Sequence, residues 1–315
     1  MKMMRSKVAM ANWAMVVSKV FGGLNVNALH YLLPLWLAPL TGATFRCVFA
    51  AVAFWILGFF ARPEKASTRD KWILFLLGAV GIYGYMFSYL MGLSKTTPVS
   101  AAIFTSMQPI WVFVISVLFM HERITLLKVV GILVGLGGAM LCILTQKSDD
   151  LASDALAGNL FCLMSSVIYA IYLVLSNQFL KRTGTYTLMR YTFSGAAVSS
   201  LIVMAFTGYD APLFESPLHL WPLVALLFVL IFPTVLSYLL VPVGLRYLKT
   251  TVVAIYGYLI LMVASIVSFL TGQDRFSWTQ ILAMVLICVG VYAVEIAENR
   301  GSRAPTSHLH SSPHA

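Results

Sequence analysis

The first apolar run of the chain carries polar side chains at the spacing of one helix face. At 100° per residue, Asn12, Lys19 and Asn27 fall within one narrow arc, and Ser18 and Asn25 share another face. Lys19 stands about 16 Å along a helix from the start of the run, near the centre of a bilayer if the run crosses one. A charge at that depth usually faces a bundle interior or water, so we predict a substrate pathway that contains Lys19, Asn25 and Asn27. The alternatives are a lysine that only packs or snorkels, and a cavity lined by the Ser18 face instead of the Asn27 face.

Two further runs offer hydroxyl and amide groups to the same pathway. The run 72–93 places Tyr85 and Ser88 on one arc together with several glycines, and close helix packing is the alternative function of such an arc. Gln108 precedes Pro109, and a proline frees a backbone carbonyl one turn back because it has no N–H. A buried amide beside a helix break can bind a substrate or form an interhelical hydrogen bond. We include Tyr85, Ser88 and Gln108 in the predicted pathway.

Tyrosines in the second half of the chain extend this set. Tyr169 and Tyr172 cluster with serines in the run 157–180, and Tyr258 lies early in the run 250–271. A tyrosine combines an apolar face with one hydroxyl, which suits the binding of organic metabolites. A belt of tyrosines at the membrane interface is the alternative. We predict that these three side chains also line the pathway.

These residues provide the chemistry of binding and not of bond cleavage. The sequence has no HExxH, no GxSxG, no Walker-type lysine loop and no paired carboxylates at helical spacing within an apolar run. The four cysteines lack the spacing of metal ligands, and His308, His310 and His314 stand in a tail that contains Ser and Pro. We therefore predict that the protein is not an enzyme and has no catalytic residues, no metal site and no cofactor.

The composition indicates that lipid is the solvent of most side chains. Hydrophobic residues make up 60% of the chain and charged residues 10%, against roughly half and a quarter in soluble domains. At about 20 residues per spanning helix, 315 residues allow roughly ten spans. Backbone groups in lipid must bond within their own segment, and the alternating polarity of a barrel is absent, so the spans are helices. We predict an all-α integral membrane protein with ten transmembrane helices, at 9–30, 38–60, 72–93, 98–119, 124–145, 157–180, 187–207, 219–241, 250–271 and 277–297.

The basic residues indicate how this bundle is oriented. Of the 21 lysines and arginines, sixteen fall in connections on one side of a ten-span bundle and three on the other, while Lys19 and Arg46 lie within spans. Connections rich in Lys and Arg face the cytoplasm. We therefore predict a multi-pass protein of the cell (inner or plasma) membrane with both termini cytoplasmic. This distribution accounts for the net charge of +10, so no nucleic-acid partner is expected.

The chain also contains an internal duplication. Shifted by 152 positions, residues 92–138 meet residues 244–290 without a gap. Each copy separates two apolar runs by an acidic residue followed by arginine, Glu122 in the first copy and Asp274 in the second. A period of half the chain indicates duplication of a bundle, and five spans per copy place the two copies in opposite orientations. The predicted parts are a first five-helix repeat at 1–147, a second, inverted repeat at 155–298, and a cytoplasmic disordered tail at 299–315.

Several short motifs occur in a recognisable order. They are Gly23-Leu24-Asn25 in the first span, Arg46 in the second, Gly92-Leu93, Ala102 through Pro109, Glu122-Arg123-Ile124-Thr125, and Gly131 through Gly138. In this arrangement the chain resembles EamA-type members of the drug/metabolite transporter superfamily over nearly its whole length. The second copy departs from the family pattern, with Leu261 where a proline is expected and Asp274 in place of Glu. The resemblance implies that spans 1, 3, 4, 6, 8 and 9 line a central cavity and that spans 5 and 10 are peripheral.

The predicted function is secondary transport, in the direction of export, of small organic metabolites such as amino acids by alternating access. The alternatives are an antiporter of the sugar-phosphate or nucleotide-sugar type and a membrane scaffold that does not transport. The expected partners are the lipid bilayer and a small metabolite, and the protein is expected to be a monomer or a homodimer.

The distribution of acidic residues limits the charges that the predicted substrate can carry. Glu295, at the cytoplasmic end of the last span, is the one acidic residue within the predicted spans, whereas Lys19 and Arg46 lie at depth without acidic partners. A proton-driven exporter of cations needs a carboxylate at membrane depth, because an unpaired cation is costly there. We therefore predict a neutral, zwitterionic or anionic substrate.

Overall fold

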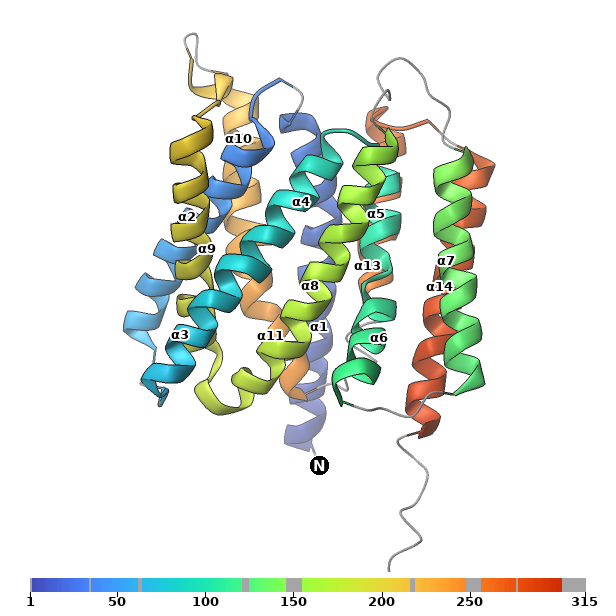
Figure 1. Cartoon of the computed structure of the whole chain (residues 1–315), viewed down its shortest axis with the longest axis horizontal. Coiled ribbons are helices and arrows are strands. Elements are labelled where there is room, and N and C mark those ends of the chain that lie inside the picture. Colours follow the sequence, from blue (N-terminus) through green and yellow to red (C-terminus); the bar gives the residue numbers. More distant parts are fainter. Residues whose placement is uncertain are drawn as a thin grey trace, which may run out of the picture.

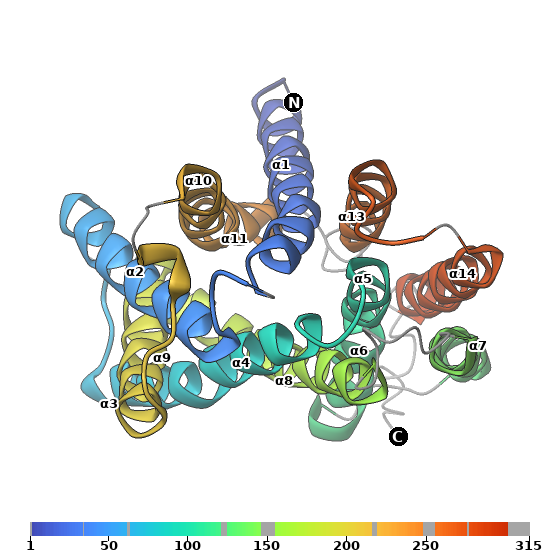
Figure 2. The same cartoon turned by 90° about the horizontal axis from the view of Figure 1, so that it is seen from above.

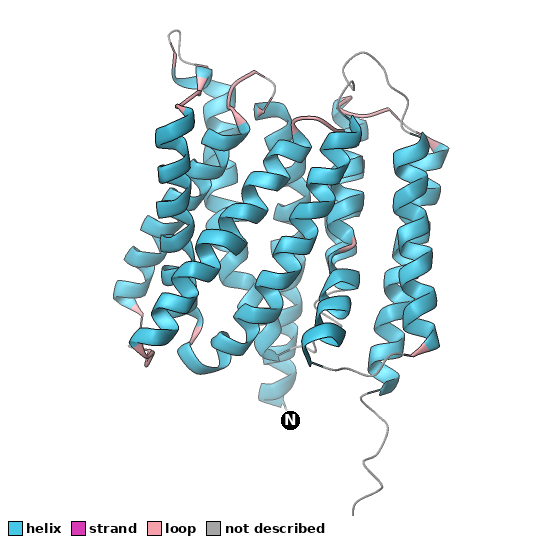
Figure 3. Cartoon of the chain, in the orientation of Figure 1, coloured by secondary structure: helices cyan, strands magenta, loops and turns pink. Residues whose placement is uncertain are grey.

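The computed structural model describes residues 2–33, 35–61, 64–120, 125–145, 155–215, 219–247, 256–275 and 277–301. Within these ranges all regular secondary structure is helical (Figures 1 and 3), which confirms the predicted all-α class. The elements are α1 (Lys2–Leu32), α2 (Pro39–Phe60), α3 (Thr68–Leu77), η1 (Gly78–Ile82), α4 (Tyr83–Leu93), α5 (Pro98–Ser106), α6 (Gln108–Met120), α7 (Leu126–Thr145), α8 (Ala155–Thr183), α9 (Thr185–Thr207), η2 (Pro212–Phe214), α10 (Leu220–Val229), η3 (Leu230–Leu236), α11 (Ser237–Tyr247), α13 (Gly257–Thr271) and α14 (Trp278–Gly301).

Many of these helices have the length and composition of membrane spans. Six segments of the described chain are long and apolar enough to cross a membrane, at Pro39–Phe60, Thr68–Leu93, Pro98–Ile115, Ala155–Leu180, Thr185–Thr207 and Leu220–Gly244. Shorter apolar helices occupy Val129–Gly138, Leu259–Thr271 and Trp278–Gly290. The long helix α1 is not among them, because polar residues such as Lys19 and Asn25 lower its mean hydropathy. Large apolar side chains such as Phe59 and Phe206 point outward, as expected of surfaces that face lipid.

Helices occupy the described parts of the predicted ranges, with differences at their ends and with the predicted span 98–119 divided at Met107 into α5 and α6. The first helix begins at Lys2, seven positions before the predicted start of the span at 9, and α14 continues to Gly301. The structure therefore extends the last helix into the first residues of the predicted tail. The remainder of that tail, the start of the predicted span at 250, and the predicted turn at Glu122 lie outside the described residues.

Two of the long helices contain a π-helical segment. In the first, η1 joins α3 to α4, and in the second, η3 joins α10 to α11. Their first residues, Gly78 and Leu230, lie 152 positions apart, which is the shift found in the sequence. The helices α7 and α14 also begin 152 positions apart, at Leu126 and Trp278. The same distortion thus occurs at equivalent places in the two halves of the chain.

The helices form one bundle, with a pair of helices at one edge that contacts α5 and α6. Helix α1 packs against α11 and α13, α4 packs against α8, and α5 packs against both α8 and α13, so that these helices surround the middle of the bundle (Figure 2). Helices α2 and α9 pack against each other at one end, and α7 and α14 pair at the opposite edge. The latter two are the helices for which the family resemblance implied a peripheral place.

Glycines allow α7 and α14 to approach closely. A Cβ atom added to Gly290 would lie 2.5 Å from the carbonyl oxygen of Gly131 and 2.6 Å from the backbone nitrogen of Gly135. A Cβ atom added to Gly138 would lie 2.9 Å from the carbonyl oxygen of Ala283. Small residues at helical spacing permit such contacts between membrane helices. The glycines of this region therefore serve packing.

The acidic residue of the second copy caps another helix. Asp274, in the connection between α13 and α14, accepts hydrogen bonds from the Thr97 side chain and from the backbone N–H of Val99, at the first turn of α5. These groups belong to a helix N-terminus, where backbone N–H donors lack partners within the helix. Burial raises the pKa of the Asp274 carboxyl, and the hydrogen bonds from Thr97 and from the N–H of Arg275 oppose that rise. Asp274 thus joins the α13–α14 connection to the start of α5.

Candidate functional site: a central cavity

A cavity of about 110 Å³ lies in the middle of the bundle. Its walls come from α1, α2, α4, α5, α6, α8, η3, α11 and α13, and hence from both halves of the chain. The polar and charged residues that line it are Ser18, Lys19, Asn25, Arg46, Tyr85, Tyr89, Thr105, Gln108, Ser166, Tyr169, Ser237 and Tyr238. Two of these side chains are cations, and no carboxylate is among the described residues that line the cavity.

The cavity brings together five of the nine predicted pathway residues. These are Lys19, Asn25, Tyr85, Gln108 and Tyr169. The face of α1 that lines the cavity carries Ser18 and Asn25, the predicted alternative, together with Lys19 from the edge of the other arc.

Asn27, Ser88 and Tyr172 are placed elsewhere. The side-chain amide of Asn27 donates to the carbonyl of Ala264, 3.1 Å away on α13. Ser88 and Tyr172 are each 2% exposed and are not part of the lining; a Cβ atom added to Gly81 would lie 3.2 Å from the Cβ of Tyr172. Asn27 and Tyr172 thus lie at helix–helix contacts, and Ser88 is buried outside the lining. The side chain of Tyr258 lies outside the described part of the structure.

One wall of the cavity is built from stacked tyrosines. The rings of Tyr85 and Tyr169 have centroids 4.5 Å apart, and Tyr89 stacks on Tyr85 at 6.1 Å with the planes 20° apart. Tyr238, on α11, adjoins this wall through a side-chain hydrogen bond with Tyr169 and meets Phe193 edge to face at 5.0 Å. Such rings present broad apolar faces with a few hydroxyls, which is typical of sites for small organic molecules. Tyr89 and Tyr238 were not among the residues that the sequence analysis selected.

Arg46 enters the cavity from α2, and its orientation is fixed by η3. Its side chain is 2% exposed, and its Nε donates to the hydroxyl of Thr234 over 3.0 Å. That hydroxyl in turn donates to the carbonyl oxygen of Val229 over 2.7 Å. Four positions after Val229 stands Pro233, which has no N–H to offer to this carbonyl. Pro233 therefore removes the usual i+4 donor to this carbonyl, the Thr234 hydroxyl donates to it, and Thr234 in turn orients Arg46.

Three polar groups in the lining have no partner among the described residues. The terminal nitrogen Nη1 of Arg46 and the Oδ1 of Asn25 are buried without a hydrogen bond. No hydrogen bond or ion pair joins the ammonium of Lys19 to a described residue. Buried polar groups are normally paired, and those that are not require an explanation. A ligand in the cavity would supply the missing partners.

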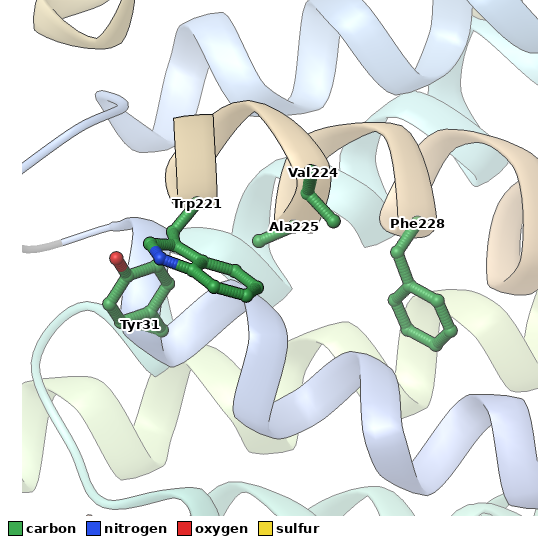
Figure 4. Close-up of a pocket in the computed structure, with 5 residues that line it drawn as sticks. All are labelled: Tyr31, Trp221, Val224, Ala225 and Phe228. Atoms are coloured by element: carbon green, nitrogen blue, oxygen red, sulfur yellow. The ribbon is translucent and has the colours of Figure 1, made fainter. Parts of the chain in front are cut away.

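A second, larger groove lies on the outside of the bundle (Figure 4). It has a volume of about 540 Å³ and is lined by Tyr31, Trp221, Val224, Ala225 and Phe228, from α1 and α10. Its walls are almost entirely apolar and aromatic, and it contains none of the charged residues. Such a groove suits a lipid chain, so the central cavity is the candidate site.

Within the described ranges, no group of three His, Cys, Asp or Glu side chains is placed to hold a metal ion. Three cysteines are free thiols within the described chain, of which Cys47 and Cys162 are buried and Cys288 is half-buried.

Comparison with known proteins identifies the family. A family model described as the EamA-like transporter family matches residues 10–144 and, a second time, residues 156–296. The chain belongs to the EamA-like transporter family. It is accordingly a multi-pass membrane protein of a family of transporters and not an enzyme.

Relatives and a solved structure agree with this assignment. The uncharacterized transporter YyaM of Bacillus subtilis is 26% identical over 275 residues, which cover 86% of this chain and 89% of that protein. The aromatic amino acid exporter YddG of Ancylobacter novellus is 27% identical over 139 residues, 44% of this chain and 48% of that protein. One crystal structure superposes with a TM-score of 0.60 at 18% identity, over 94% of this chain and 98% of its own, and shows the shared fold alone.

Proposed function

We propose that this protein is a secondary transporter that exports a small organic metabolite through the central cavity by alternating access. The single observation that carries this proposal is a cavity built from both halves of the chain and lined by Lys19, Arg46 and a wall of tyrosines. A site between two halves that move against each other is the recurrent design of secondary transporters. Of the predicted pathway residues, we assign Lys19, Asn25, Tyr85, Gln108 and Tyr169 to this site.

The proposed mechanism uses two inverted five-helix repeats with both termini in the cytoplasm. The equal spacing of η1 and η3, the equal spacing of α7 and α14, and the two matches to one family model support the duplication. The asymmetry of the basic residues supports the orientation. A reporter fused after Ala297 is expected to be cytoplasmic, and one inserted near Asp150 external. Both reporters on one side of the membrane would contradict the inverted arrangement.

The proposed substrate is neutral, zwitterionic or anionic. Two cations line the cavity without a carboxylate in the described lining, and a further cation there would be repelled in a low dielectric. Amino acids are natural candidates, because one relative is named an aromatic amino acid exporter. The same two cations also suit a phosphate, which keeps the sugar-phosphate or nucleotide-sugar type of antiporter as the second candidate.

The proposal predicts flux through reconstituted protein that depends on Lys19. Proteoliposomes of the wild type should transport at least one labelled amino acid or organic acid above the rate of empty liposomes, and should not transport ethidium-like cations. Lys19→Gln and Lys19→Met should reduce this flux while the folded yield holds. A matched control is Arg182→Gln, which removes a cation that is 59% exposed in a surface pair with Asp70 and should leave flux unchanged. No flux of any metabolite would indicate a scaffold, and robust flux of cations would contradict the assignment of charge.

A further inference from the structure

We propose that Arg46 and Lys19 form an oxyanion subsite for the carboxylate of an organic acid, whose apolar body lies along the Tyr85–Tyr169 wall. This inference rests on the proposed function, because it names the class of substrate that the transport cavity takes. The proposed class of substrate is narrower than the neutral, zwitterionic or anionic metabolites named above, because the preferred ligand carries a carboxylate and no ammonium.

The geometry of Arg46 is the first support. Its Nε is occupied by Thr234, so the hydrogen bond fixes the plane of the guanidinium. Its Nη1 is buried without a partner and lies in a side chain that lines the cavity. A guanidinium offers its donors in a rigid planar fork that matches a carboxylate. The unpaired Nη1 of Arg46 is therefore a donor suited to an anionic oxygen, and the hydrogen bond to Thr234 fixes its direction.

The balance of charge is the second support. A buried cation is tolerated when it is paired, and removal from water is costly when it is not. In the described part of the chain, Lys19 has no ion-pair partner and the cavity lining contains no Asp or Glu. The anion that would neutralise these side chains is therefore absent from the protein itself. A substrate that brings a carboxylate supplies it, whereas an ammonium on the same substrate would add a third positive charge.

The tyrosine wall and Asn25 indicate the rest of the ligand. Tyr85 and Tyr169, 4.5 Å apart between ring centroids, offer an apolar surface to a flat or aliphatic body. The Oδ1 of Asn25 is a buried acceptor without a partner, so a hydroxyl or N–H on that body would satisfy it. An aromatic or hydroxylated organic acid combines the carboxylate for the two cations, the apolar body for the tyrosine rings and the donor for Asn25.

The test measures the affinity of the purified full-length protein for five phenyl probes of similar size by isothermal titration. The probes are phenylacetate, its neutral amide phenylacetamide, the zwitterion phenylalanine, the cation phenethylamine and the phosphate ester phenyl phosphate. Phenylacetate should bind at least about tenfold more tightly than phenylacetamide, which is the size of a charge-assisted hydrogen bond. Phenylalanine should bind more weakly than phenylacetate, and phenethylamine most weakly.

Variants assign this preference to the two cations. Arg46→Gln and Lys19→Gln should each reduce the preference for phenylacetate over phenylacetamide, with little change for the amide, and Arg182→Gln should leave it intact. If Arg46→Gln yields no folded protein, Arg46→Lys keeps the charge but loses the fork and should still weaken phenylacetate binding. Equal affinity of the wild type for the acid and its amide would overturn the subsite. Phenyl phosphate binding tenfold more tightly than phenylacetate would also overturn it, in favour of a phosphate.

The two proposals fail in different ways. Liposome flux of amino acids without any preference for carboxylates in binding would overturn the subsite and leave the transport function standing. A carboxylate preference that depends on Arg46, in a protein that transports nothing, would support the subsite and overturn the transport function.

Discussion

The π-helical segments η1 and η3 begin 152 residues apart and have different consequences for the bundle. In η1, a Cβ atom added to Gly78 would overlap the carbonyl of Thr192 on α9. Next to it, the carbonyl of Ala79 accepts a hydrogen bond from the hydroxyl of Ser199 over 3.2 Å. This segment therefore joins α9 to the α3–α4 helix and contributes nothing charged to the cavity.

In η3 the same distortion orients a charged side chain. At the 152-residue shift, Pro233 and Thr234 stand where η1 has Gly81 and Ile82, and the carbonyl of Val229 accepts the hydroxyl of Thr234 within the same helix. Thr234 then accepts from Arg46 at the cavity. The comparison shows that a backbone carbonyl at each segment accepts a side-chain hydroxyl, and that the local residues decide what these carbonyls hold. At η1, beside Gly78, the carbonyl of Ala79 takes part in packing against α9. At η3, the carbonyl of Val229 holds Thr234, which orients Arg46.

The largest effect expected from this comparison is on folding at η1. Gly78→Ala would place a methyl group on the backbone of Thr192, which cannot move as a flexible side chain can. We expect destabilisation of about 3 kcal/mol or more, at the upper end of the range for overpacking, and hence a severe loss of monodisperse protein in size-exclusion chromatography. The matched control is Gly137→Ala, where nothing lies within 4 Å of an added Cβ and alanine is the better helix former. Similar yields of the two variants would show that η1 tolerates separation from α9.

Much of the helical framework could be predicted from the sequence, because apolar runs of about 20 residues have one solution in lipid. The rotation of each helix about its axis could not, because it depends on distant partners. Asn25 and Asn27 lie on different faces of α1, and the sequence could not show which face meets the cavity; the hydrogen bond from Asn27 to Ala264 places its face against α13 and leaves Asn25 in the cavity. Tyr172 lies beside Tyr169 as predicted, with the ring centroids 5.9 Å apart, but it packs against Gly81 and does not line the cavity.

The hydrogen-bond chain from Arg46 through Thr234 to Val229 was harder to predict from the sequence. Arg46 was recognisable as a charge at membrane depth, but its partner Thr234 stands 188 positions away. The π-helical segments did not disturb the apolar pattern, so nothing in the periodicity marked them. Pro233 was a visible signal of a helix with an unsatisfied carbonyl, and the hydroxyl that follows it shows which group would use that carbonyl.

The most direct measurement of the central claim is a double-mutant cycle on the affinity for phenylacetate. Thr234→Val should weaken binding by about tenfold in the wild-type background, because Arg46 loses the group that orients it. In the Arg46→Gln background, the same substitution should have little further effect, since coupled residues are not additive. Ser199→Ala is the matched control at η1 and should lower stability by about 1 kcal/mol without changing affinity. Full additivity of Thr234→Val and Arg46→Gln, or a loss of affinity in Ser199→Ala equal to that in Thr234→Val, would contradict the account.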